Sequence, residues 1–106
     1  DDTLSGMGGE DIIDGNLGND NILGGSGADK LIGGEGSDVI DGGSGTDTVD
    51  YSQDSDEGGL SGVSVDLGAG SATDGFGDTD TLSNIENIRA TDASDSIIGS
   101  DADNVL

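Results

Sequence analysis

The sequence predicts an all-β fold in which very short parallel strands stack into a solenoid. Three observations lead to this prediction: aspartate recurs every nine residues, glycines keep fixed offsets from it, and an aliphatic residue follows two positions later. The unit reads G-G-x-G-x-D-x-(aliphatic)-x, in five consecutive copies over residues 6–50. A fixed period indicates a stack of equivalent turns, because each repeat buries its apolar face only against its neighbours.

The periodic positions form sets with a constant phase. The aspartates are Asp2, Asp11, Asp20, Asp29, Asp38 and Asp47. The aliphatic residues are Leu4, Ile13, Ile22, Leu31, Ile40 and Val49. The first glycines of the units are Gly6, Gly15, Gly24, Gly33 and Gly42, and the last are Gly9, Gly18, Gly27, Gly36 and Gly45. One description of a unit therefore serves for all five.

Each unit is expected to be a tight loop followed by a strand of three residues. Glycine permits the positive φ that a tight loop needs. In the unit 24–32, residues 30–32 form the strand, and its central residue, Leu31, points to the opposite face from its neighbours. Two units make one coil of 18 residues, so alternate units share a sheet. The expected sheets are units 6–14, 24–32 and 42–50, and units 15–23 and 33–41.

The composition indicates that a bound cation stabilises the fold. The chain has 106 residues, room for one domain, with 24 acidic residues, 2 basic residues, a net charge of -22 and 29% hydrophobic residues. Such a composition is typical of disorder, and ordering a residue costs about 1–2 kcal/mol of backbone entropy. The thin aliphatic core cannot offset this alone. With no Cys and no His, the available ligands are oxygens, which suit hard cations such as calcium.

Coil spacing agrees with calcium. Parallel strands lie about 4.8 Å apart, and calcium binds oxygen at roughly 2.3–2.6 Å, so one ion can bridge two stacked loops. Carboxylates about 5 Å apart repel by roughly 3 kcal/mol at an effective dielectric of 20. Magnesium fits less well, because it demands octahedral geometry and retains its waters.

Residues 6–50 resemble the calcium-binding nonapeptides of the repeats-in-toxin (RTX) family, found in secreted bacterial toxins, metalloproteases, lipases, epimerases and large adhesins. The resemblance implies a right-handed parallel β-roll, with two short-stranded sheets and several Ca²⁺ ions in the loops. In that family each ion lies between loops two units apart, held by aspartates and loop carbonyls. The implied pairs are Asp11 with Asp29, Asp20 with Asp38, Asp29 with Asp47, and, as a fourth candidate, Asp2 with Asp20.

The resemblance also implies backbone carbonyl ligands from the first four positions of each unit. These are Gly6, Gly8, Gly9, Gly15, Asn16, Leu17, Gly18, Gly24, Gly25, Ser26, Gly27, Gly33, Gly34, Glu35, Gly36, Gly42, Gly43, Ser44 and Gly45. Met7 and Asn16 replace the second glycine. Asn tolerates the left-handed conformation, so the first loop, with Met7, departs furthest from the motif.

The chain is expected to divide into a regular roll over 1–50 and a degenerate continuation over 51–106, with an irregular insertion near 52–62. Residues 63–67 alternate and predict a strand. Residues 75–82 form one degenerate unit. Leu82, Ile85 and Ile88 are spaced by three, which fits either a helical turn or further rungs of the roll.

The nine-residue phase returns late in the chain. Glu86, Asp95 and Asn104 carry it, mostly without glycine loops. Asp80 and Asp95 are added to the candidate metal ligands. Partial units at 2–4 and 104–106 suggest a piece of a longer chain.

Several residues are expected to have no part in metal binding. Asp14, Asp41 and Asp50 lie outside the acid position of the motif and are expected in solvent. Lys30 and Arg89 are expected to be surface charges. Tyr51 and Phe76 are expected to pack at the edges of the roll.

The composition also excludes function classes. Without His or Cys, no Ser-His-Asp or Cys-His arrangement can form, so no enzyme is expected. The negative charge opposes nucleic-acid binding. No apolar run reaches 18 residues, so no membrane span is expected.

The expected function is a calcium-binding module that folds on calcium binding outside the cell, as part of a larger exported protein. The resemblance implies type I secretion by a Gram-negative bacterium and an extracellular or cell-surface location. The alternatives are a calcium-rigidified spacer or adhesive segment of a giant adhesin or surface-layer protein, and an accessory domain of an enzyme. The expected partners are calcium and the rest of the parent chain, and an open roll end also allows end-to-end self-association.

Overall fold

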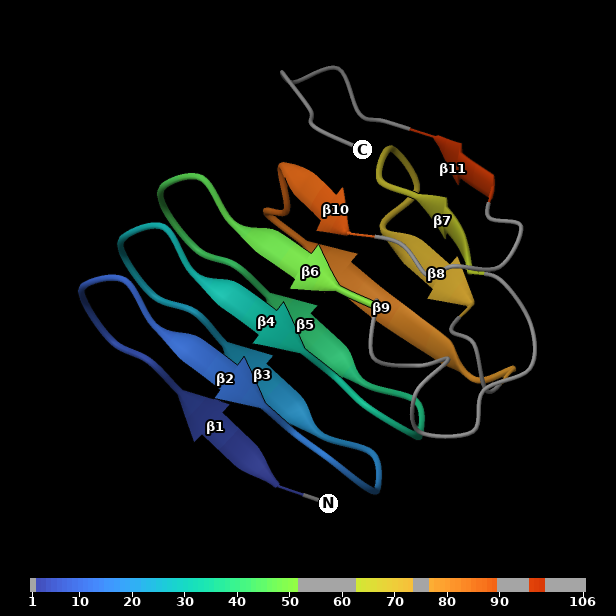
Figure 1. The fold of residues 1–106 in the computed structure, drawn as a ribbon, viewed down its shortest axis with the longest axis horizontal. Helices are drawn as coiled ribbons and strands as arrows, with labels where there is room; N and C mark the ends of the chain where they lie inside the picture. Colours follow the sequence, from blue (N-terminus) through green and yellow to red (C-terminus); the bar gives the residue numbers. More distant parts are fainter. Residues whose placement is uncertain (1, 52–62, 74–76, 90–95, 99–106) are drawn as a thin grey trace.

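The computed structural model describes residues 2–51, 63–73, 77–89 and 96–98, in which the regular elements are all β-strands (Figure 1). The strands are β1 (Thr3–Ser5), β2 (Ile12–Asp14), β3 (Asn21–Leu23), β4 (Lys30–Ile32), β5 (Val39–Asp41), β6 (Thr48–Asp50), β7 (Ser64–Asp66), β8 (Ser71–Thr73), β9 (Thr79–Ser83), β10 (Asn87–Arg89) and β11 (Ser96–Ile98). No described segment is a helix of the length and apolarity that a membrane crossing requires.

Alternate units share a sheet, as the period predicts. One sheet has the order β1-β3-β5-β9-β8-β7-β11 and the other β10-β6-β4-β2. In the regular part all pairs are parallel and offset by 18 residues, so that Leu4 pairs with Ile22 and Ile13 with Leu31. Figure 1 shows the two sheets as successive coils of one roll. The predicted all-β roll of two short-stranded parallel sheets is confirmed.

The core is one row of central strand residues from each sheet. Ile22, Leu31, Ile40 and Val49 are fully buried. Leu82 pairs with Ile40, and Ile88 pairs with Val49 in the same register. The spacing by three in residues 82–88 therefore reflects further rungs of the roll and not a helical turn.

The loops stack as closely as the strands. Ser26 N donates to Met7 O at 2.8 Å, and Gly9 N donates to Ser26 O at 2.9 Å. A Cβ atom on Gly25 would fall on the carbonyl oxygen of Met7, so this position requires glycine. Met7 itself takes the loop conformation at φ 74° and Asn16 at φ 70°. The first loop thus keeps the motif geometry despite Met7.

The continuation departs from a purely parallel roll at one strand. β8 pairs antiparallel with both β7 and β9. The predicted strand at 63–67 is confirmed as β7, and β11 resumes parallel pairing with it. The predicted insertion near 52–62, together with Phe76, Asp95 and Asn104, lies outside the described residues.

Two predictions of solvent exposure or edge position are wrong. Asp50 is only 2% exposed, and its Oδ2 lies 3.0 Å from Lys30 Nζ. The reason is that β6 is an interior strand, with β4 on one side and β10 on the other. Tyr51 lies in the core and not at an edge of the roll. Asp14 is exposed as expected.

Asp41 and the two cations fit their expectations to different degrees. Asp41 is half-buried, and its Oδ1 accepts hydrogen bonds from Gly43 N and Asn84 Nδ2. Arg89 is exposed, as predicted. The Lys30 side chain is 37% exposed and pairs with Asp50, so it is a surface charge that also serves a buried acid.

Candidate metal centre

The motif aspartates form two hydrogen-bonded ladders that run along the stack. Each rung is a backbone N–H that donates to the carboxylate one coil further on. The rungs are Asp2 N to Asp20 Oδ1 at 2.6 Å, Asp11 N to Asp29 Oδ1 at 2.9 Å, Asp20 N to Asp38 Oδ1 at 2.9 Å, and Asp29 N to Asp47 Oδ1 at 3.0 Å. Asp38 N continues one ladder to Asp80 Oδ1 at 2.8 Å, and Asp47 N continues the other to Glu86 Oε2 at 2.9 Å.

The second carboxylate oxygen of these aspartates faces the loops. In Asp11, Asp29 and Asp47, the Oδ2 atom is buried and accepts no hydrogen bond. Asp20 and Asp38 also bury Oδ2. A buried acceptor without a donor costs about 1–3 kcal/mol, and more when charged. A cation at this position would remove that cost.

A carbonyl oxygen from the next coil lies near the Oδ2 atoms of Asp11, Asp20 and Asp29. A Cβ atom on Gly6 would lie 2.5 Å from Asp11 Oδ2 and 2.7 Å from Gly24 O. A Cβ atom on Gly24 would lie 2.7 Å from Asp29 Oδ2 and 2.6 Å from Gly42 O. At Gly6 and Gly24 the missing side chain leaves room where a carboxylate oxygen and a carbonyl oxygen of two coils converge, and this room is the open position of the glycine.

The same arrangement holds at Gly15 in the other ladder. A Cβ atom on Gly15 would lie 2.5 Å from Asp20 Oδ2 and 2.7 Å from Gly33 O. Carboxylate and carbonyl oxygens are the hard ligands that calcium takes in proteins. Within the described ranges, no three His, Cys, Asp or Glu side chains come together as a metal cluster. The donor set is instead pairs of carboxylates with backbone carbonyls, which is the chemistry of calcium and not of zinc.

The remaining predicted carbonyl ligands divide by position. The second and third residues of the loops use their carbonyls for hydrogen bonds between coils, as Asn16 O, Gly25 O, Ser26 O, Glu35 O and Ser44 O do. A carbonyl oxygen has two lone pairs, so such a bond leaves one free for another partner. Gly24, Gly33 and Gly42 turn their carbonyls toward the open position. The structure thus brings loops 6–9, 24–27 and 42–45 together in one row, and loops 15–18 and 33–36 in the other.

The outlying predicted ligands differ from the central ones. Asp2 is exposed and joins the ladder through its N–H. Asp80 is fully buried, and its Oδ2 accepts a hydrogen bond of 2.8 Å from the Tyr51 hydroxyl. Asp95 lies outside the described residues. Asp80 therefore extends the ladder, but its Oδ2 atom already accepts a hydrogen bond, whereas Asp11 Oδ2 accepts none.

Sequence reasoning missed two residues at the end of the other ladder. Glu86 occupies the rung after Asp47. Asn84 places its carbonyl oxygen at the open position of Gly42. The return of the nine-residue phase at Glu86 was the available signal, but no glycine loop precedes it.

The surroundings of Asp47, near the end of its ladder, favour the neutral form of its carboxyl group. Burial raises the pKa of Asp47 above its usual 3.8, and the charges of Asp29 and Glu86 raise it further. The N–H of Asp29, which donates to Asp47, opposes the shift. A cation at this place would reverse the balance, because it favours the ionised form.

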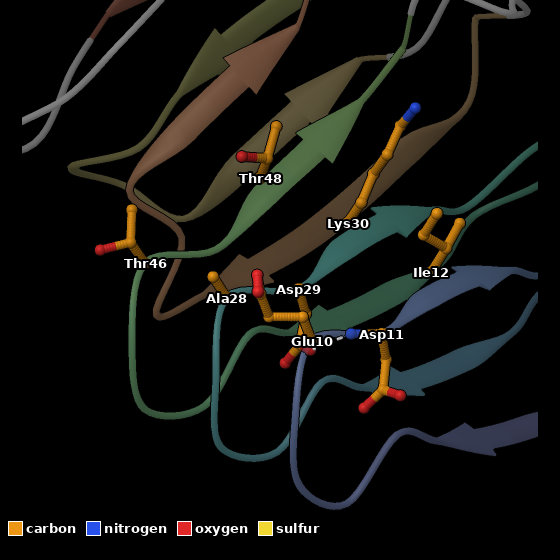
Figure 2. A pocket seen from close by; sticks show the side chains of 8 residues that line it. All are labelled: Glu10, Asp11, Ile12, Ala28, Asp29, Lys30, Thr46 and Thr48. Atoms are coloured by element: carbon orange, nitrogen blue, oxygen red, sulfur yellow. Dashed lines mark hydrogen bonds between the residues drawn. The ribbon is translucent and has the colours of Figure 1, made fainter.

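A cavity of about 320 Å³ lies beside the first carboxylate pair, over the sheet of β2, β4 and β6 (Figure 2). It is lined by Glu10, Asp11, Ile12, Ala28, Asp29, Lys30, Thr46 and Thr48. Figure 2 shows Asp11 and Asp29 joined by their ladder hydrogen bond at one end of it, and Lys30 and Ile12 along the strands. The Asp11–Asp29 pair therefore lies at the edge of this cavity, with both Oδ2 atoms buried.

Comparison with known proteins agrees with this geometry. The sequence profile of the RTX calcium-binding nonapeptide repeat matches the chain in four copies, over residues 1–31, 23–57 and 80–106. No curated protein matches the chain. These repeats bind calcium as structural modules and occur in proteins secreted by Gram-negative bacteria. With matches over most of its length, this chain belongs to the RTX calcium-binding nonapeptide repeat family.

Proposed function

We propose that this chain is a module of a larger secreted protein that folds when it binds several calcium ions outside the cell. The observation that carries the proposal is the set of buried Oδ2 atoms in Asp11, Asp29 and Asp47, which accept no hydrogen bond and lie beside carbonyl oxygens of the next coil. Asp20 and Asp38 are the proposed ligands in the second row, where they form the same rung. The proposed ligands thus bridge successive coils in both rows.

The charge of the chain supports coupling between calcium and folding. The net charge is -22, and folding brings ladder carboxylates to within about one strand spacing, 4.8 Å. At that distance each pair repels by roughly 3 kcal/mol before screening. A ligand that binds only the folded state stabilises it by mass action. Calcium thus replaces the repulsion between neighbouring carboxylates with coordination of both by one ion.

The affinity range of such modules supports a switch between compartments. Extracellular calcium modules have dissociation constants of about 10⁻⁴–10⁻³ M. A chain of this affinity stays unfolded where free calcium is low and folds where calcium is millimolar. We propose that the chain leaves the cell unfolded and folds at its extracellular or surface location.

The two parts of the chain have different proposed roles. Residues 1–50 carry the regular loops and the proposed ions, and the strands β7 to β11 of residues 51–106 extend the stack. The proposed role is structural and not catalytic, because the motif acids are held in backbone ladders. The outward residues share no common type, which gives no regular adhesive array; they are Thr3, Ile12, Asn21, Lys30, Val39 and Thr48.

A circular dichroism titration from chelator to roughly 10 mM calcium, beyond the range of extracellular modules, tests the proposal. Magnesium in a parallel titration controls for ionic strength and charge. We expect a transition from coil to β-structure with calcium alone. An unchanged β spectrum in chelator would refute the folding switch and favour a rigid spacer that stands without ions.

A further inference from the structure

We infer that the end of one ladder holds a further calcium ion, in a site made by Asp47, Asn84 and Glu86 in place of a second nonapeptide loop. The inference rests on the proposed function, because it assumes that calcium is the ion these loops bind. It adds two ligands that lie outside the glycine motif. It also extends the metal-binding row beyond the regular repeats.

The site repeats the arrangement of the preceding one, with Glu86 in the place of an aspartate and Asn84 in the place of a glycine. In the preceding site, Asp29 turns Oδ2 toward the open position of Gly24, Gly42 contributes its carbonyl oxygen, and Asp47 Oδ1 accepts the N–H of Asp29. At the end of the ladder, Asp47 turns Oδ2 toward the open position of Gly42, at 2.6 Å from where a Cβ would lie. Asn84 contributes the carbonyl oxygen, and Glu86 Oε2 accepts the N–H of Asp47.

The short segment 83–87 is held firmly against the loop 42–45. Gly42 N donates to Ser83 O at 3.0 Å, and Asn87 N donates to Asp47 O at 2.9 Å. Asn84 has φ 53°, a left-handed conformation that asparagine tolerates. Its side-chain amide donates to Asp41 Oδ1 at 2.8 Å.

Asp41 connects the two halves of the site. The same Oδ1 atom accepts the N–H of Gly43 at 3.0 Å, so one carboxylate orients both the glycine loop and Asn84. Only two residues separate the end of β9 from Glu86, where five separate the end of β5 from Asp47, and glutamate has the longer side chain. A short turn can therefore present the same oxygens as a full loop.

The independent observation is the second oxygen of Asp47. Asp47 is fully buried, and its Oδ2 accepts no hydrogen bond. The end of the other ladder differs, because there Asp80 Oδ2 accepts the Tyr51 hydroxyl. The protein supplies its own donor at one ladder end and none at the other, where a cation completes the arrangement.

The donor chemistry selects calcium. Two carboxylates and a backbone carbonyl are hard oxygen ligands, and calcium accepts six to eight of these in flexible geometry. Glu86 is half-buried, so water can complete the coordination. Magnesium is disfavoured, because it demands near-ideal octahedral geometry and gives up its waters reluctantly.

The test is the change Glu86→Gln in the full chain. Glutamine keeps an oxygen that can accept the N–H of Asp47, so the ladder survives while the charge is lost. The matched control is Asp14→Asn, which removes the same charge at an exposed position outside the ladders. Calcium bound per chain is counted by native mass spectrometry, and affinities are measured by isothermal titration calorimetry.

We expect Glu86→Gln to bind one ion fewer than the parent chain at the calcium concentration that just saturates the parent. We expect the affinity for that ion to fall at least about tenfold, since ligand charge tunes calcium affinity. Asp14→Asn should match the parent. An unchanged ion count and affinity in Glu86→Gln would overturn the inference, whereas a parent chain that binds no calcium would overturn the proposed function itself.

A second measurement covers the case in which Glu86→Gln does not fold. The chain has four glutamates, Glu10, Glu35, Glu57 and Glu86. In the parent chain with ¹³C-labelled glutamate, calcium should strongly shift the side-chain carboxyl resonance of one glutamate. The line shape of that resonance should also change, as expected for a carboxylate that binds the ion. Four carboxyl resonances that all stay at solvent-exposed values in saturating calcium would refute the assignment of Glu86.

Discussion

Replacing Asp29 with asparagine should have opposite effects with and without calcium. Asp29 is the central rung of its ladder: its Oδ1 accepts the N–H of Asp11, and its own N–H donates to Asp47. It borders two proposed sites, one toward Asp11 and one toward Asp47. Asparagine has the same size and keeps an acceptor for the rung, so the change mainly removes one charge.

In calcium, Asp29→Asn should destabilise the roll. A tenfold loss of affinity corresponds to about 1.4 kcal/mol, so two weakened sites lose about 3 kcal/mol together at saturating calcium. In chelator the sign reverses. Each neighbouring carboxylate at about 5 Å contributes roughly 3 kcal/mol of repulsion at a dielectric of 20, so removing one charge relieves up to about 6 kcal/mol before salt screening.

Two titrations measure these effects. Urea unfolding in saturating calcium gives the loss, and folding induced by an excluded osmolyte in chelator gives the gain, since such osmolytes favour the compact state. Asp14→Asn is the matched control, because Asp14 is exposed and lies outside the ladders. Equal destabilisation by Asp29→Asn in both conditions would refute the argument, since it would show that Asp29 acts through packing and not through charge.

Three further outcomes follow from the structure. Tyr51→Phe removes the hydroxyl that donates to buried Asp80, so unfolding in calcium should become easier by about 1–3 kcal/mol, and no change in urea midpoint would contradict this. Met7→Gly relieves a positive φ of 74° at a side chain that is 77% exposed, so the folded state should become more stable by about 0.5–1 kcal/mol. The calcium concentration at the midpoint of folding should therefore fall, and a higher midpoint would contradict this. Because the pKa of Asp47 is raised in the roll, its protonation stabilises the calcium-free fold below pH 3.8, and this contribution is lost as pH rises through the raised value. Acid should therefore increase β-structure in chelator by circular dichroism, and a loss of β-structure on acidification would argue against it.

The regular half of the roll is predictable because its units are equivalent. The nine-residue period fixed the sheet partners of Ile13, Leu31 and Val49 before any coordinates, since a stack of identical turns allows one register. The same equivalence placed Asp11 and Asp29 on neighbouring rungs. The proposed ligands of the regular loops follow from this equivalence.

The sequence by itself determined the parallel stack, the two sheets, the glycine loops and the row of aspartates, because a fixed repeat length determines which units lie next to one another. Only the tertiary structure decided where the pattern breaks. The pairing of Lys30 with Asp50, the contact of Tyr51 with Asp80, and the use of Glu86 as a rung depend on residues 20, 29 and 39 positions apart. None of these separations is a multiple of the nine-residue period. These groups come together because the irregular segments pack against the stack, and a local sequence pattern does not show that packing.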